Sequence, residues 1–113
     1  GKVDVIYLPT DNTTASAAES IIQVGRNNRL PVFAGDSGTV ERGAIATLSF
    51  NYYDVGRQTG QMALRLFSGE RPGDIPVELA EKLELVINLS AAEAMGVTIP
   101  ESVIARADEV IEE

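Results

Sequence analysis

The stretch Val3–Ile22, "VDVIYLPTDNTTASAAESII", indicates the fold class. Its first part, Val3–Leu8, is mostly apolar and β-prone, which predicts a short strand buried on both faces, as in a parallel sheet, with Tyr7 in the core. After a proline the chain enters a run of short polar side chains, in which Asn12 or Thr13 is the predicted N-cap of a helix. That helix carries an apolar stripe at helical spacing: Ala17, Ala18, Ile21, Ile22 and Val24.

The next segments continue the alternation of strands and helices. Leu30–Ala34 predicts a second strand at the spacing of a right-handed crossover, and Ala44–Ser49 predicts a third. Tyr53–Ser68 is the longest predicted helix. Gly56 and Gly60 within it each cost about 1 kcal/mol relative to alanine. We therefore interpret both glycines as points where the helix packs closely on a sheet.

The last third of the chain alternates between short elements. Leu83–Ser90 predicts a strand, and Ala91–Met95 predicts a short helix with Gly96 at its C-terminal end. Glu101, directly after a proline, predicts the start of another helix, while helix and edge strand both remain open for residues 106–113. The β-α-β-β-α order indicates an α/β domain. Because the first strand begins by residue 3 with few neighbours available, we interpret the chain as a piece of a larger protein.

The composition excludes several functional classes. The chain has 113 residues and a net charge of −8, with no cluster of basic side chains for a phosphate backbone, so we expect no nucleic-acid partner. It contains no cysteine and no histidine. Disulfides, zinc–thiolate sites and cysteine catalysis are therefore ruled out, and the commonest general base is absent. We expect neither a metal nor a cofactor.

Short polar side chains follow each of the first three predicted strands. They lie in Pro9–Asn12, Gly35–Gly38 and Ser49–Asn51. In open α/β sheets, ligands bind beyond the carboxyl ends of parallel strands. A carboxylate there suits an ammonium group, while hydroxyls and the N–H groups of a helix start suit a carboxylate. The pattern therefore favours an amino-acid-like ligand over a phosphate.

Two other interpretations of these residues remain open. Asp, Asn, Ser and Thr are also the usual residues of helix caps and turns, and each one taken alone is more commonly a cap than a ligand contact. An enzyme would use Asp11 and Asp36 as an acid–base pair or as magnesium ligands. A phospho-acceptor receiver domain would also need a lysine after a late strand, whereas Lys82 precedes its strand. We therefore predict binding without catalysis.

Three long stretches resemble a known family. They are "VIYLPTDN", "PVFAGDSGTVERGAIATLSFNYYDVGRQTGQMALRLFSGERPGDIPVE" and "LELVINLSAAEAMGVTIPESVIARADEVIE". Together they closely resemble the C-terminal portion of ABC-transporter substrate-binding proteins, in particular the group that includes tryptophan- and other aromatic-amino-acid-binding lipoproteins. The resemblance covers nearly the whole chain.

This resemblance implies a type I periplasmic-binding-protein fold, in which two α/β lobes with mostly parallel sheets flanked by helices close over a ligand. Residues 1–49 would be part of the C-terminal lobe. Residues 50–82 would cross the hinge and place a helix on the N-terminal lobe, and residues 83–113 would cross back and finish the chain. The rest of the N-terminal lobe would lie outside this sequence.

The resemblance also implies a binding site. Thr10, Asp11 and Asn12 would face the cleft, and so would Gly35, Asp36 and Ser37 on the next strand end. Ser49, Phe50 and Asn51 would lie at the hinge. Asp11 would bind the ligand ammonium, and Thr10 and Asn12 would supply hydrogen bonds. Phe50, Tyr52 and Tyr53 could line an aromatic pocket or simply pack.

The implied function is that of the solute-binding component of an ABC importer, which binds a small amino-acid-like ligand, aromatic ones included, by hinge closure. Its partners would be the ligand and a membrane permease. The full-length protein would be a membrane-anchored lipoprotein in the periplasm or outside the cell. The alternative is an effector-binding domain of a regulator or sensor with the same fold. An unpaired strand edge also predicts self-association of the fragment.

Overall fold

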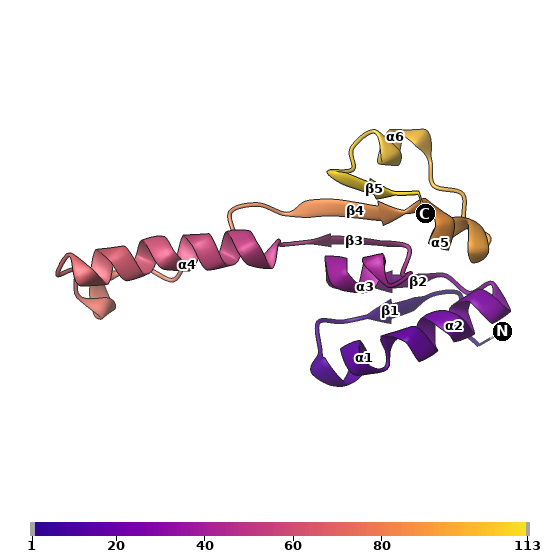
Figure 1. The fold of residues 1–113 in the computed structure, drawn as a ribbon, viewed down its shortest axis with the longest axis horizontal. Coiled ribbons are helices and arrows are strands. Elements are labelled where there is room, and N and C mark those ends of the chain that lie inside the picture. Colours follow the sequence, from indigo (N-terminus) through magenta and orange to yellow (C-terminus); the bar gives the residue numbers. More distant parts are fainter. Residues whose placement is uncertain (1, 113) are drawn as a thin grey trace. The chain divides into compact units, whose positions relative to one another are not determined.

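The computed structural model describes residues 2–112, which form two compact units (Figure 1). The first unit contains the chain up to Ser49 and again from Glu84 onward, and the second is Phe50–Leu83. Helices flank short strands in the first unit, so the prediction of an α/β fold with mostly parallel sheets is confirmed.

The first unit contains ten of the helices and strands, and two of its three strand pairings are parallel. β1 pairs with β2 in parallel, β4 pairs with β5 in parallel, and β3 lies antiparallel to β4. The amide of Ile45 donates to the carbonyl of Val32 at 2.7 Å, which links the start of β3 to β2. The elements are β1 (Ile6–Leu8), α1 (Asn12–Ser16), α2 (Ala18–Asn28), β2 (Val32–Ala34), α3 (Ser37–Glu41), β3 (Ala46–Ser49), β4 (Glu84–Asn88), α5 (Leu89–Ala94), α6 (Glu101–Ile104) and β5 (Glu109–Ile111).

Pairing with a distant strand determines the secondary structure within residues 106–113, for which the sequence left helix and edge strand open. Residues 109–111 form strand β5, whose Val110 is the parallel partner of Ile87. The carbonyl of Leu85 also accepts the amide of Asp108 at 2.9 Å. A strand at 106–113 was one of the two predicted alternatives, and the pairing with β4 selects it.

The core lies where α2, the sheet strands and α5 meet. Its fully or almost fully buried members include Ile22, Val32, Ile45, Ile87 and Met95. Gly25 of α2 permits this packing: a Cβ atom there would lie 2.5 Å from Cγ2 of Val32. The predicted stripe is correct for Ala18 and Ile22, whereas Ala17 and Val24 are exposed.

The helix predicted after β1 differs from the structure in two ways, at its N-cap and at Ala17. Asp11 is the N-cap, in place of Asn12 or Thr13, because its carboxylate accepts the amides of Thr13 and Thr14. The helix is also broken at Ala17, which separates α1 from α2. A carboxylate that precedes two free amides makes a good cap, which explains the one-residue shift.

The prediction that Tyr7 belongs to the core is wrong. Successive side chains of a strand point to opposite faces, and in β1 the buried residue is Leu8. Tyr7 is 63% exposed, and Val3 and Val5 at alternate positions before it are also exposed. Within the described residues, β1 is therefore buried on one face only.

Asn88 is a buried polar residue that joins α3, β4 and α5. Its Nδ2 donates to the carbonyl of Val40 at 3.1 Å, and its Oδ1 accepts the amide of Ala91 at 2.8 Å as the N-cap of α5. A buried amide with both ends paired adds specificity to the packing at little desolvation cost.

The second unit consists of α4 (Tyr52–Phe67), the 3₁₀ turn η1 (Pro72–Asp74) and an extended return segment. Polar contacts hold the return segment on the helix. Gln58 donates to the carbonyl of Leu79 at 2.8 Å, and Arg65 pairs with Glu70 and, at 3.4 Å, with Glu78. No residue of α4 is buried, although its length and position agree with the predicted helix.

The interpretation of the α4 glycines as points of close packing is not supported within residues 2–112. A Cβ atom at Gly56 or Gly60 would meet nothing within 4 Å. The face on which these glycines lie also carries exposed Tyr53, Leu64 and Phe67. A sheet that packs against this face is not among the described residues. Separately, none of the helices in this range is both long and apolar enough to cross a membrane.

Candidate ligand-binding site

The strand-end loops after β1 and β2 touch each other. Leu8 is the register partner of Ala34, so the two parallel strands end side by side, as Figure 1 shows. The amide of Gly35 donates to the carbonyl of Leu8 at 2.8 Å. A Cβ atom on Gly35 would lie only 3.1 Å from the amide nitrogen of Thr10 and 3.1 Å from the hydroxyl of Tyr7. The absence of a side chain at Gly35 therefore allows the two loops to approach.

Asp11 is fixed by a cap that uses one of its oxygens. Oδ1 accepts the amides of Thr13 and Thr14, each at 3.0 Å. Thr14 in turn donates its hydroxyl to the carbonyls of Pro9 and Asp11, at 3.1 and 3.0 Å. Within residues 2–112, the second oxygen of Asp11 accepts no hydrogen bond, and the residue is exposed. The carboxylate is thus held in place with one oxygen open to solvent.

Asp36 is more fully committed to its own helix. Its Oδ1 accepts the amide of Thr39 and its Oδ2 accepts the Thr39 hydroxyl, both at 2.8 Å. Asp36 is half-buried and Thr39 is almost fully buried. The helix-start amides of Thr13, Thr14 and Thr39, which the sequence suggested for a ligand carboxylate, are therefore occupied by the protein's own caps.

Three neighbouring polar side chains remain free to bind a ligand. Thr10 and Asn12 are exposed and Ser37 is half-buried. Among the described residues, none of these three side chains makes a hydrogen bond. The structure thus brings together five of the six predicted site residues, Thr10, Asp11, Asn12, Asp36 and Ser37, on two touching loops.

The sixth, Phe50, belongs to the second unit. Its ring contacts that of Tyr52 edge to face, with centroids 5.1 Å apart and planes at 81°. Asn51 between them is the N-cap of α4 and accepts the amide of Tyr53 at 2.8 Å. Phe50 is half-buried, while Tyr52 and Tyr53 are largely exposed, so in this unit the aromatic side chains form an open pair and not an enclosed pocket.

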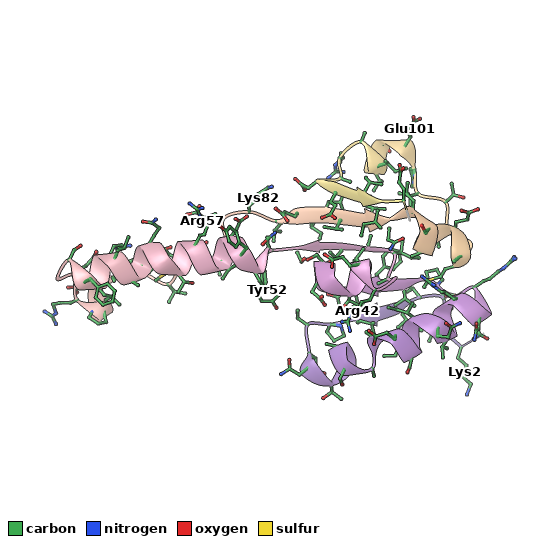
Figure 2. All side chains as sticks on the ribbon, in the orientation of Figure 1. Lys2, Arg42, Tyr52, Arg57, Lys82 and Glu101 are labelled. Carbon is green, nitrogen blue, oxygen red and sulfur yellow. The ribbon has the colours of Figure 1, made fainter. Side chains whose placement is uncertain are left out.

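Two residues beside the strand-end loops were missed in the sequence. Tyr7 was assigned to the core, although its alternation with Leu8 was a usable signal. Arg42 carried no signal, since its bonds to Ala15 and Glu19 join residues more than twenty positions apart in the chain. Figure 2 labels Arg42, which directly follows α3; its guanidinium donates to the carbonyl of Ala15 at 2.9 Å and to Glu19 at 3.2 Å. A backbone hydrogen bond and, after it, the bond from Arg42 lower the pKa of Glu19 below its usual value.

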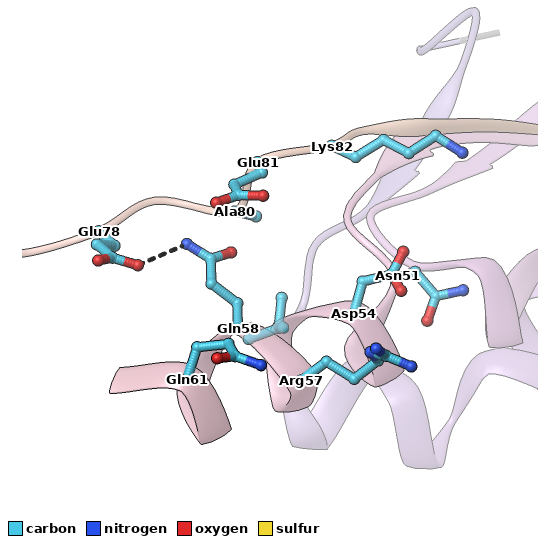
Figure 3. Close-up of a pocket in the computed structure, with 10 residues that line it drawn as sticks. Asn51, Asp54, Arg57, Gln58, Gln61, Glu78, Ala80, Glu81 and Lys82 are labelled. Carbon is cyan, nitrogen blue, oxygen red and sulfur yellow. Dashed lines mark hydrogen bonds between the residues drawn. The ribbon is translucent and has the colours of Figure 1, made fainter. Parts of the chain in front are cut away.

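A separate hollow of about 410 Å³ lies within the second unit (Figure 3). The first turns of α4 and the return segment around Glu78–Lys82 line it. Asp54 and Glu81 face it together with Arg57, so its lining is polar and mixed in charge. Within residues 2–112, no group of three or more carboxylates is placed to hold a metal ion.

Residues 1–111 match the family model described as "ABC transporter substrate binding protein". A curated relative, the tyrosine-binding protein of Clostridioides difficile, is 35% identical over 95 residues, which is 84% of this chain and 28% of the relative. The name of this relative is that of a binding protein, in agreement with the prediction of binding without catalysis.

Two solved structures share the fold. A conserved domain protein from Vibrio cholerae matches with a TM-score of 0.87 and 47% identity, over 96% of this chain and 37% of that one. The ABC domain from Streptococcus pneumoniae in complex with L-Trp matches with a TM-score of 0.87 and 35% identity, over 97% and 37% of the two chains. The present chain thus spans between about a quarter and two fifths of the length of these relatives.

Proposed function

The chain belongs to the ABC transporter substrate-binding protein family, and we propose that it is part of the solute-binding component of an importer for an amino acid, with L-tyrosine and L-tryptophan as the first candidates. The observation that carries this proposal is the pair of touching strand-end loops, in which Asp11 is held by a cap and keeps one oxygen open. The ligands in the names of the tyrosine-binding relative and the L-Trp complex support the choice of amino acids.

The loops offer complementary groups for a zwitterion. Asp11 supplies the charge for the ligand ammonium, and Thr10, Asn12 and Ser37 supply uncommitted hydroxyl and amide groups for its carboxylate. Hydrogen bonds to charged groups contribute about 1.5–3 kcal/mol each. In this proposal Asp36 holds its loop in shape, because both its oxygens are engaged with Thr39.

We further propose the arrangement of the whole protein. Residues 1–49 belong to the C-terminal lobe, residues 50–82 cross the hinge and place α4 on the N-terminal lobe, and residues 83–113 cross back. The exposed apolar face of α4 and the greater length of the relatives support this assignment. Phe50 then lies at the hinge, and closure of the lobes on the ligand presents the closed form to an ABC permease. The protein works in the periplasm or outside the cell as an anchored lipoprotein.

The test is a calorimetric titration of the full-length protein with L-tyrosine and L-tryptophan. Asp11→Asn keeps a good N-cap and removes the charge, so it should weaken binding by about tenfold or more while the melting temperature stays near that of the wild type. Asp4→Asn removes the same charge from an exposed position before β1 and serves as the matched control. Equal affinity of Asp11→Asn and wild type would remove Asp11 from the site. A wild-type protein that binds neither amino acid would refute the proposed ligand class.

A further inference from the structure

Arg42 connects the two halves of the candidate site through one guanidinium group. It directly follows α3 and donates from Nη1 to the carbonyl of Ala15 at 2.9 Å and to Glu19 at 3.2 Å. From Nη2 it donates to the hydroxyl of Thr39 at 3.1 Å, and from Nε to the carbonyl of Gly38 at 3.3 Å. The acceptors belong to α1 and α2, which both follow β1, and to α3, which follows β2.

Each side of this contact leads directly to a strand-end loop. On one side, the hydroxyl of Thr39 that accepts from Arg42 donates to Oδ2 of Asp36 at 2.8 Å. On the other side, Ala15 belongs to α1, the five-residue helix whose N-cap is Asp11. An unbroken series of contacts therefore runs from the Asp36 loop through Thr39 and Arg42 to the helix that holds Asp11.

From this geometry we propose that Arg42 is a positioning residue, which sets the distance and orientation between the Asp11 loop and the Asp36–Ser37 loop and so determines ligand affinity. The inference rests on the proposed function, because it assigns Arg42 a role in the same site. Within residues 2–112, Arg42 makes no hydrogen bond to the loop residues proposed to contact the ligand, which are Thr10, Asp11, Asn12 and Ser37. It acts through the helices that follow those loops.

The chemistry of the contact requires arginine. A planar guanidinium can donate to several acceptors in a fixed fork, whereas an ammonium is a compact point charge. The ion pair with Glu19 is exposed, and exposed pairs contribute little to stability. The bonds to Ala15 and Thr39 therefore define the role of Arg42 more than its charge does.

The test compares Arg42→Met and Arg42→Lys in the full-length protein, with L-tyrosine and L-tryptophan as the probes. Both variants should bind about tenfold more weakly than wild type, because lysine restores the charge but not the fork. Arg26→Met is the matched control, since Arg26 is an exposed arginine of α2 in the same unit. Melting temperatures are measured in parallel, because a purely structural tie lowers the melting temperature without changing the affinity of the folded protein.

A double-mutant cycle tests whether Arg42 acts on the Asp36 loop through Thr39. Thr39→Val removes the hydroxyl that Asp36 and Arg42 share and keeps the shape of the side chain. If Arg42 acts through Thr39, the two substitutions weaken binding by less together than the sum of their separate effects. Additive losses would overturn this series of contacts, and full affinity of Arg42→Met would overturn the inference while the proposed function stands.

If the wild-type protein binds neither probe, the proposed function is refuted, and hydrogen exchange then tests the role of Arg42 separately. Arg42→Met should then accelerate exchange at the cap amides of Thr13 and Thr14 and at that of Thr39, since these report on both loops. Acceleration on both loops supports Arg42 as the residue that couples them. Unchanged exchange at either loop overturns it.

Discussion

Gly35 allows two backbone segments to approach where a side chain would separate them. A Cβ atom there would lie 3.1 Å from the amide nitrogen of Thr10 and 3.4 Å from the carbonyl oxygen of Leu8, and both of these are backbone atoms that yield little. The conformation of Gly35 itself is ordinary, because its φ is not among the positive values. The requirement for glycine is therefore one of space between the two loops.

Gly35→Ala should consequently move the Asp11 loop and the Asp36 loop apart by a few tenths of an ångström. We expect a stability loss of about 1 kcal/mol, typical of mild overpacking, and a clear loss of amino-acid affinity in the full-length protein. Gly38→Ala is the control, since its Cβ would make an ordinary 3.4 Å contact and alanine favours the helix. Denaturant unfolding and calorimetry measure both effects. Wild-type affinity in Gly35→Ala would show that the spacing of the loops is unimportant for binding.

α4 differs from α2 because polar contacts and not buried side chains hold it to its neighbours. Its partners are the return segment, through Gln58, and Glu70 and Glu78, through Arg65. Isolated helices of this length are marginal in water, and in proteins most helical stability comes from packing of an apolar face. In the proposed arrangement, the exposed face of α4 would therefore depend for its stability on packing against the N-terminal lobe.

Gly56→Ala and Gly60→Ala test this dependence. In the 113-residue chain each substitution should stabilise α4 by about 0.5–1 kcal/mol, since nothing lies within 4 Å of the added methyl group. In the full-length protein the same substitutions should be neutral or destabilising, because in the proposed arrangement the glycines face the N-terminal lobe. Circular dichroism melts of both forms give the comparison. A gain of equal size in both would show that no partner approaches these glycines.

At the scale of the whole molecule, local signals predicted the elements, and long-range contacts decided what the sequence left open. Val32–Ala34 lies within the predicted strand Leu30–Ala34, and Glu101 at the start of α6 agrees with the predicted helix start. Caps, turns and hydrophobic spacing are properties of a few neighbouring residues. The strand at 109–111 and the bonds from Arg42 to Ala15 and Glu19 depend on residues more than twenty positions away, which no local pattern contains.

The errors have the same origin. Tyr7 was expected in the core because both faces of a parallel strand are usually covered, and the described residues cover only one. The α4 glycines were expected against a sheet that these residues do not supply. The five loop residues of the candidate site could be named from the rule that ligands bind beyond strand ends. The different roles of Asp11 and Asp36 could not, because they depend on the hydrogen bonds between Asp36 and Thr39, which only the structure shows.

The exposed apolar side chains of the second unit lead to a prediction about association. Phe67 is 86% exposed, Val77 94% and Leu79 84%, and exposed large apolar side chains favour association. We expect the 113-residue chain to self-associate through these exposed side chains. In the proposed arrangement the N-terminal lobe covers α4, so the full-length protein should remain monomeric. Sedimentation velocity over a range of concentrations measures both.

Phe67→Glu should return the 113-residue chain to a monomer, since a charge at the most exposed aromatic position opposes burial of that surface. Val5→Glu is the informative control, because Val5 is an exposed apolar residue next to the unpaired edge of β1, the other surface through which a partner could add. If Val5→Glu abolishes association and Phe67→Glu does not, the strand edge is the associating surface. In that case the exposure of α4 would lose its value as support for a covering lobe, and the assignment of residues 50–82 to the hinge and the N-terminal lobe would rest on the relatives alone.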